Sequence, residues 1–250
     1  MSKVMLERRD DGVRVITLDD PDRRNILAPE LCGDLLAAVQ AVLADGGARA
    51  LVVTGAGSAF CGGADMPAVF GDRDRSVAQL RDDLHEVYRS FLAIRELQIP
   101  TIAAVQGPAV GAGLNLAMVC DLRVVGPDAS LAATFSRIGL HPGGGCTWFL
   151  VRAMGADRAL KMLLDGGAVR GADAVAAGVA THFAEDPLEA SLALAQRYAA
   201  IDGQLVRDIK RAVEIASSAS LETTLEFESW AQASSATKDA VHEFLRSFQK

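Results

Sequence analysis

Two glycine-rich segments carry the residue types that can surround an oxygen atom with backbone N–H groups. They span residues 55–66 and 107–113, and each directly follows a short apolar stretch typical of a buried strand. Small residues let a ligand approach the backbone and leave N–H groups free to bind an oxygen. The second segment also precedes an apolar helix, whose N-terminus favours negative charge. Two such turns after two parallel strands can converge into an oxyanion hole.

Glycine at these positions is also compatible with two different roles. Each turn could be a tight connection only, and Gly55-Ala56-Gly57 after a strand also matches the start of a dinucleotide-binding turn. Position 60 is Phe, however, where that turn needs Gly or Ala, and no Gly-x-x-x-x-Gly-Lys-Ser/Thr motif occurs. Because two turns of the same kind follow two strands, we favour the oxyanion hole.

Few protic side chains accompany the turns. Asp65 ends the first turn, and because Asp side chains readily bond nearby backbone N–H groups, we expect it to brace the turn. His85 and Glu86 precede the second turn on a helix, where neighbouring carboxylates favour a solvated face over a catalytic role. His141 lies in a third glycine-rich turn, where it either bonds backbone or acts on a substrate.

The pattern of apolar residues predicts an α/β fold that holds the turns on parallel strands. Gly12 separates two alternating segments, 6–9 and 13–18, which predicts an antiparallel hairpin. Residues 50–54 and 102–105 are apolar throughout, as expected for strands that are covered on both faces. An amphipathic helix between these two strands completes a βαβ pattern.

Two further segments bear on the site and on the domain organisation. Residues 69–79 are polar and weakly patterned, which predicts a mobile loop that could act as a lid beside the first turn. Strand signals end near residue 186, and helical patterns continue from there. We therefore expect a core of residues 1–185 that carries the site, followed by a helical region of residues 186–250 that covers the pocket and mediates oligomerisation.

Composition and charge exclude several classes of protein. The chain has 250 residues, 50% of them hydrophobic, which is enough for one large core. A net charge of -7 without a Lys/Arg block argues against a nucleic-acid partner. The sequence has no membrane-length apolar run and no signal-peptide pattern at its start, so we expect a cytoplasmic protein that does not span a membrane. Four scattered cysteines predict neither disulfides nor a metal site.

A series of motifs resembles those of the enoyl-CoA hydratase/isomerase family, also called the crotonase family. In chain order the matching segments are Pro21-Asp22-Arg23-Arg24-Asn25, Thr54-Gly55-Ala56-Gly57, Ala59-Phe60-Cys61-Gly62-Gly63-Ala64-Asp65-Met66, Pro100-Thr101-Ile102-Ala103-Ala104-Val105-Gln106-Gly107, Gly111-Ala112-Gly113, Leu116-Ala117-Met118-Val119-Cys120-Asp121 and Gly139-Leu140-His141-Pro142-Gly143-Gly144-Gly145. The similarity covers essentially the full chain.

This resemblance implies a crotonase-type spiral of ββα repeats with a C-terminal helical region, assembled as a homotrimer or a dimer of trimers. It implies an acyl-CoA thioester as ligand, with coenzyme A as part of the substrate and no separate cofactor or metal. The two oxyanion N–H groups fall on Ala64 and Ala112, with Gly111 adjacent to the second. The residues placed against coenzyme A are Arg24, near the phosphates, and Ala59, Phe60, Cys61, Gly62, Gly63, Ala64, Asp65 and Met66.

The sequence departs from the family at the positions of the catalytic acids. A hydratase of this family carries two glutamates, and the matching positions are Asn115 and Phe135. A third position, where some family isomerases and dehalogenases carry aspartate, is Gly143. An amide can orient a water molecule but cannot take up a proton at neutral pH, and Phe135 can only shape the acyl pocket. His141 is the nearest titratable residue in the matched motif.

Three functions are compatible with this pattern. The first is an enoyl-CoA hydratase, a lyase of fatty acid metabolism that hydrates 2-trans-enoyl-CoA with help from the oxyanion hole. The second is an acyl-CoA carrier or sensor that keeps the thioester pocket without the chemistry. The third is another enolate reaction, such as isomerisation, decarboxylation or thioester hydrolysis, that uses His85, Glu86 or His141.

Overall fold

The computed structural model describes residues 2–247, and the chain divides into two compact units, Met1–Ala199 and Ala200–Lys250. The sequence places the start of the helical region at residue 186, which is where helix α8 (Pro187–Ala199) begins. This helix packs against strands of the first unit, so the compact units divide after α8 and not before it.

A six-stranded sheet in the order β1-β2-β3-β4-β6-β9 forms the centre of the first unit. Its strands are β1 (Val4–Arg8), β2 (Val13–Leu18), β3 (Ala50–Gly55), β4 (Thr101–Val105), β6 (Leu122–Val125) and β9 (His182–Phe183). The first two form the predicted antiparallel hairpin, and the remaining neighbours pair in parallel. The carboxyl ends of β3 and β4 therefore lie at the same edge, where both glycine-rich turns begin.

A second sheet of three strands repeats the connectivity of the first. It consists of β5 (Pro108–Val110), β7 (Ser130–Ala132) and β8 (Ala168–Arg170) in that order. Strand β4 of the large sheet leads to β5 of the small one, and β6 leads to β7. Within the large sheet β4 pairs in parallel with β6, and within the small sheet β5 pairs in parallel with β7. In these two passages the chain adds one strand to each sheet, as expected for ββα repeats.

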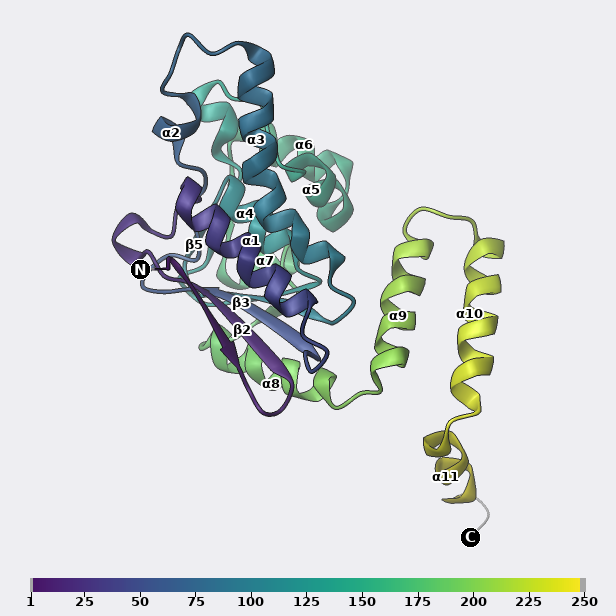
Figure 1. Ribbon diagram of the computed structural model, residues 1–250. Coiled ribbons are helices and arrows are strands. Elements are labelled where there is room, and N and C mark those ends of the chain that lie inside the picture. The colour runs from purple at the N-terminus through teal and green to yellow at the C-terminus, as the bar shows by residue number, and fades with distance from the viewer. Residues whose placement is uncertain (1, 248–250) are drawn as a thin grey trace. The chain divides into compact units, whose positions relative to one another are not determined.

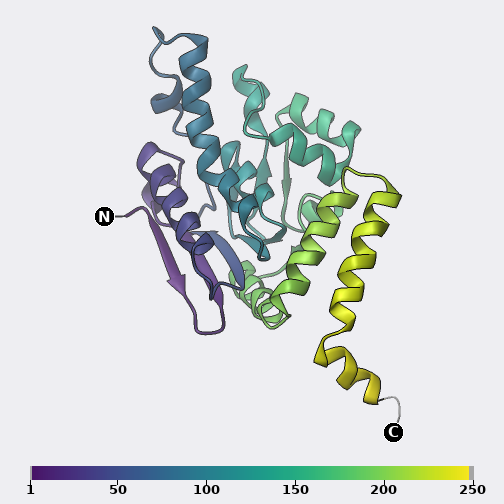
Figure 2. The same ribbon diagram turned by 45° about the vertical axis from the view of Figure 1, so that its right-hand side comes forward.

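Helices cover both faces of the large sheet, whose central strands β3 and β4 are buried throughout. Leu51 and Val53 of β3 belong to a core that includes α1 (Pro29–Leu43) and α3 (Val77–Leu92). Val52 belongs to a smaller core on the other face, which α8 covers. Figures 1 and 2 show α1 and α3 side by side.

The described part of the first unit contains further short helices, and one of them, α2, corrects the predicted loop at residues 69–79 together with α3. They are η1 (Pro21–Arg23), α2 (Met66–Phe70), η2 (Ala93–Glu96), α4 (Ala112–Val119), η3 (Thr134–Ile138), α5 (Cys146–Met154), α6 (Ala156–Asp165) and α7 (Gly171–Ala176). Helix α2 contains Val69 and Phe70, and α3 already begins at Val77. Ser76 and Gln79 start α3 with a reciprocal capping box, a polar signal that apolar periodicity does not detect.

The second unit consists of helices α9 (Gly203–Ala216), α10 (Leu221–Ala236) and α11 (Asp239–Ser247). Asp202 and Ser220 cap the first two with side-chain hydrogen bonds to backbone N–H groups. Helices α9 and α10 pack against each other, as both views show (Figures 1 and 2). Within residues 2–247, none of the helices has the length and apolar character needed to cross a bilayer.

Candidate active site

The two glycine-rich turns are joined to each other by backbone hydrogen bonds. The Cys61 N–H donates to the Pro108 carbonyl at 3.1 Å, and the Val110 N–H donates to the Cys61 carbonyl at 3.0 Å. Glycine is required for this contact, since a Cβ on Gly113 would lie 2.1 Å from the Cys61 oxygen. The turns therefore converge as the sequence predicts, and their small residues permit the approach.

The first turn is also fixed to the segment after β2. The buried Asn25 amide donates to the carbonyls of Ala56 and Ala59, each at 2.9 Å. The Gly62 N–H donates to the Arg24 carbonyl at 2.8 Å. Arg24 and Asn25 both adopt positive φ angles, 56° and 55°. The matched motif near the N-terminus is therefore a structural support for the first glycine-rich turn.

The N–H groups of Ala64 and Ala112 are the donors that remain free. The Leu27 N–H donates to the Gly63 carbonyl at 2.7 Å and the Asp65 N–H to the Leu27 carbonyl at 3.4 Å, so the intervening Ala64 N–H points away from this bridge. Ala112 is the first residue of α4, where N–H groups have no partner inside the helix. Neither N–H has an acceptor among residues 2–247.

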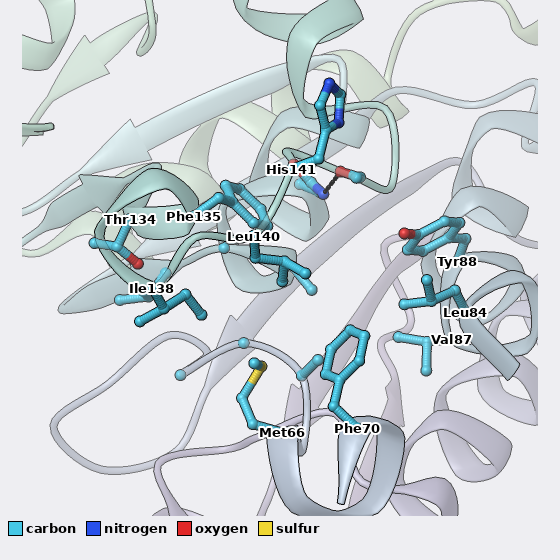
Figure 3. Close-up of a pocket in the computed structure, with 18 residues that line it drawn as sticks. Met66, Phe70, Leu84, Val87, Tyr88, Thr134, Phe135, Ile138, Leu140 and His141 are labelled. Carbon is cyan, nitrogen blue, oxygen red and sulfur yellow. Dashed lines mark hydrogen bonds between the residues drawn. The ribbon is translucent and has the colours of Figure 1, made fainter. Parts of the chain in front are cut away.

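Both alanines line one cavity of about 170 Å³. Its side-chain walls come from α2, α3, α4 and the segment around η3, with Met66, Phe70, Leu84, Phe135 and Leu140 as the main apolar contributors (Figure 3). Of the described residues that line it, none is Asp, Glu, Lys or Arg. Within the described lining, an oxygen in this cavity therefore meets backbone N–H groups and neutral polar side chains, and no Lys or Arg.

The structure brings together the positions at which the sequence departs from the family. Asn115, Phe135 and Gly143 all line the cavity that Ala64 and Ala112 line. The Asn115 amide donates to the Gly143 carbonyl at 2.8 Å, the dashed line in Figure 3. Its Oδ1 is buried and has no hydrogen-bond partner within the described chain. The motif-based counting therefore identified neighbours in space, including Gly111, which lies next to Ala112 in the same wall.

Tyr88 is a polar residue of the cavity that the sequence patterns do not reveal. Its spacing places it only on the apolar stripe of its helix, yet its hydroxyl points into the cavity toward Leu140 (Figure 3). Burial raises the pKa of Tyr88, and a hydrogen bond with the Gly144 backbone opposes part of that rise. The phenol is therefore protonated at neutral pH and can donate a hydrogen bond.

The titratable residues considered from the sequence lie at the margin of the site. His141 lines the cavity, but its side chain is exposed, its Nδ1 lies 2.7 Å from the Pro142 carbonyl oxygen, and its ring points away from Met66 and Phe70 (Figure 3). His85 and Glu86 are exposed and are not among the residues that line the cavity, and Glu86 pairs with Arg89 at 3.2 Å. The predicted solvated helix face is confirmed.

The segment matched to coenzyme A divides into a buried and an accessible part. Ala59, Phe60 and Cys61 are buried, and burial raises the pKa of the Cys61 thiol to about 12. Gly62, Gly63, Ala64 and Met66 line the cavity. The side chain of Arg24 is exposed at the surface beside them.

Asp65 supports this segment in the way the sequence predicts. Its carboxylate accepts from the Ala68 N–H at 3.2 Å at the start of α2 and pairs with Arg23 at 2.7 Å. Because these contacts occupy both carboxylate oxygens, Asp65 is a brace for the turn and for α2.

Comparison with known proteins decides the family. The model of the enoyl-CoA hydratase/isomerase family matches residues 8–250. This chain belongs to the enoyl-CoA hydratase/isomerase family. It is 46% identical over 197 residues to the "Probable enoyl-CoA hydratase EchA14" of Mycobacterium tuberculosis, an alignment that covers 79% of this chain and 76% of the relative.

Solved structures of relatives agree with this assignment and confirm the crotonase fold. The crystal structure of an enoyl-CoA hydratase from Polaromonas sp. JS666 matches with a TM-score of 0.89 and 26% identity, over 98% of this chain and 96% of that one. A protein from Thermobifida fusca YX, crystallised in complex with CoA, matches with a TM-score of 0.83 and 28% identity, over 98% and 95% of the two chains. The enoyl-CoA hydratase/isomerase family is a family of enzymes, and this chain has its fold across its length.

Proposed function

We propose that this protein binds acyl-CoA thioesters with the thioester oxygen between the N–H groups of Ala64 and Ala112, and that it hydrates 2-trans-enoyl-CoA. The observation that carries the proposal is that the N–H groups of Ala64 and Ala112 have no acceptor within the described chain and line the same cavity. Enolate formation places negative charge on the thioester oxygen, where fixed donors in a water-poor site are most effective. Loss of one such donor typically costs about 10²- to 10³-fold in rate.

Proton transfer is the weak part of this hydratase. Asn115 can orient a water molecule through its amide but cannot accept its proton, and Phe135 only shapes the cavity. The loss of one general acid or base typically lowers the rate by about 10²- to 10⁴-fold. We therefore expect slow hydration, well below the rate of a family member with both carboxylates.

A second candidate is an acyl-CoA carrier or sensor. It is favoured by the lack of any carboxylate among the described residues that line the cavity. Such a protein would bind acyl-CoA tightly without turnover. Isomerisation, decarboxylation and thioester hydrolysis are further enolate reactions that the same two donors could support.

Coenzyme A itself would lie along Gly62, Gly63 and Met66, with Arg24 near its phosphates. The exposed Arg24 side chain supports this placement. The Thermobifida fusca relative, which was crystallised in complex with CoA, supports CoA as the ligand. No cofactor beyond the coenzyme A of the substrate is needed. We also propose that the protein forms a homotrimer or a dimer of trimers. A cytoplasmic location is supported by the four free cysteines, which suit a reducing compartment.

Two measurements on one preparation test the proposal. Crotonyl-CoA hydration is followed by absorbance at micromolar protein, and acetoacetyl-CoA binding by calorimetric titration. Binding together with hydration above a buffer control supports the hydratase. Binding without hydration replaces it by a carrier or another enolate reaction, and no binding overturns the thioester site altogether.

A further inference from the structure

The hydroxyl of Tyr88 lies in contact with the third glycine-rich turn. A Cβ built on Gly143 would lie only 2.3 Å from the Tyr88 oxygen, so glycine at this position makes room for a hydroxyl that arrives from α3. The Tyr88 ring packs against Phe91 of the same helix, with the ring centroids 6.2 Å apart. The hydroxyl therefore has a defined place in the wall of the cavity that Ala64 and Ala112 line (Figure 3).

The backbone of Gly144 supplies a donor to the Tyr88 oxygen. The hydrogen bond between them lowers the pKa of Tyr88, which an N–H group does by donating to the oxygen of an acid and stabilising its ionised form. Gly144 also lies just before α5, and the N-terminus of a helix favours negative charge. Negative charge on the Tyr88 oxygen is thus stabilised. The bond uses a lone pair of that oxygen, so the phenol's own proton stays available to a ligand.

The other protic side chains of the described lining are placed less well for proton transfer. Thr134 lies beside Ile138, on the opposite side of the view from Tyr88, and its aliphatic hydroxyl is a weaker acid than a phenol (Figure 3). The ring of His141 is exposed and points away from the apolar residues of α2. Asn115 carries an amide, which does not take up a proton at neutral pH. Tyr88 is therefore the candidate on which proton transfer depends.

We propose that the Tyr88 hydroxyl is a catalytic proton relay, which takes a proton from the attacking water and gives its own proton to C2 of the enoyl thioester. The water oxygen bonds to C3 as one of its O–H bonds breaks. The π electrons of the C2–C3 double bond form the new C2–H bond with the tyrosine proton. One water molecule is added in total, and Tyr88 ends protonated, as it began.

Each charge that develops in this step has a backbone donor beside it. Charge on the thioester oxygen is stabilised by the N–H groups of Ala64 and Ala112, and charge on the phenol oxygen by the N–H of Gly144. The relay rests on the proposed function, because it needs an enoyl thioester bound in this way. It explains how hydration proceeds in a cavity without a carboxylate among its described lining residues.

Tyr88→Phe tests the relay, because it removes the exchangeable proton and keeps the ring. Since one general acid or base contributes about 10²- to 10⁴-fold, we expect kcat for crotonyl-CoA hydration to fall by about 10²-fold. Calorimetric titration with butyryl-CoA should show affinity reduced by no more than about 10-fold, the effect of one net hydrogen bond. Tyr198→Phe is the matched control, since the second of the two tyrosines lies on α8 against the smaller core. Thermal unfolding verifies the fold of both variants.

The pH profile separates a relay from a structural role. The chain has two tyrosines, so 3,5-difluorotyrosine supplied to the Tyr198→Phe variant enters only position 88. Fluorine withdraws electrons and lowers the pKa of the phenol, whereas the size of the ring changes little. A relay needs the phenol proton, so kcat of the fluorinated protein should fall as the pH rises through this lowered pKa. Tyr198→Phe with ordinary tyrosine should keep its rate over the same range.

The outcomes distinguish the relay from the proposed function beneath it. A kcat that survives Tyr88→Phe, or a pH profile that fluorination does not move, overturns the relay and leaves the hydratase in place. A wild-type protein that binds butyryl-CoA but does not hydrate crotonyl-CoA overturns the proposed hydration, and the relay with it. A wild-type protein that binds neither thioester overturns the thioester site as well.

Discussion

The two sides of the cavity that Ala64 and Ala112 line differ in whether backbone or side-chain atoms supply their polar groups. On the first, which we call the backbone wall, Ala64 and Ala112 present N–H groups whose positions are fixed by hydrogen bonds between two turns. On the second, which we call the side-chain wall, Asn115, Phe135 and Tyr88 determine the polarity. The backbone wall matches the family motifs, whereas the side-chain wall lacks both of the family's hydratase carboxylates.

The difference shows how the family can keep a ligand and change the chemistry. A backbone donor survives the replacement of its own side chain, because alanine offers the same N–H as glycine. A side-chain acid disappears with a single substitution. Under the proposed function, thioester binding by backbone N–H groups therefore tolerates side-chain substitution, whereas acid/base catalysis by side chains does not.

The largest expected effect comes from restoring acids to the side-chain wall. In Asn115→Glu/Phe135→Glu, crotonyl-CoA hydration should rise by about 10²-fold or more, because each general acid or base contributes about 10²- to 10⁴-fold. Absorbance measures the rate. Ile138→Glu is the control, since it adds a carboxylate at an exposed position of the same cavity. An unchanged rate in a double variant that still binds acetoacetyl-CoA would contradict the assigned roles of these positions.

The backbone wall should lose stability when the close contact between the first and second glycine-rich turns is blocked. Gly113→Ala places a Cβ 2.1 Å from the Cys61 oxygen, and such overpacking costs about 1–3 kcal/mol. Urea unfolding measures the loss, and acyl-CoA binding should fall with it. Gly33→Ala in α1 is the matched control, since its Cβ would meet nothing within 4 Å. If both variants are as stable as the wild type, the two turns are not packed as described.

A smaller effect is expected at the brace of the first turn. Asp65→Ala removes the N-cap of α2 and the ion pair with Arg23, and loss of a cap typically costs about 1 kcal/mol. The half-exposed Arg23 adds little to this figure because solvent screens the pair. Chemical denaturation measures the change, with Asp22→Ala, at an exposed position next to Arg23, as the control. A loss above about 3 kcal/mol would show that the brace carries more than a cap.

The smallest expected effect concerns the buried thiols that lie behind the site. Burial raises the pKa of Cys61 and of Cys146 to about 12, so neither forms a reactive thiolate at pH 8. These pKa values exceed 9.0, the ordinary value of a thiol. The protonated thiols therefore contribute to the free energy of unfolding in full below pH 9, and this contribution is lost as the pH rises toward 12. Iodoacetamide labelling followed by mass spectrometry should modify both only in urea. Labelling of the native protein at pH 8 would contradict their burial.

The backbone wall was predictable because glycine spacing and short buried strands are local signals. The hairpin at Gly12, the parallel strands and the convergence of the two turns were all predicted from such patterns and are confirmed. The loop at residues 69–79 was predicted too long, since the capping box of Ser76 and Gln79 starts α3 with polar residues. Local polarity alone does not distinguish a loop from a capped helix end.

The residues of the side-chain wall were predictable only at positions that correspond to the family motifs. Asn115, Phe135 and Gly143 were identified by position and lie in the cavity. Tyr88 was not, because a tyrosine on an apolar helix stripe gives no sign of which way its hydroxyl points. Only the close packing of that hydroxyl on Gly143 reveals it, and this contact joins segments far apart in the sequence.

The central claim is that one thioester oxygen accepts two hydrogen bonds from Ala64 and Ala112. Carbon-13 NMR of butyryl-CoA labelled at the carbonyl carbon tests it most directly, because that ligand has no double bond to hydrate. The account predicts a downfield shift of the carbonyl resonance on binding, since two donors withdraw electron density from the C=O group. A bound ligand whose carbonyl resonance stays at its position in free solution would contradict it.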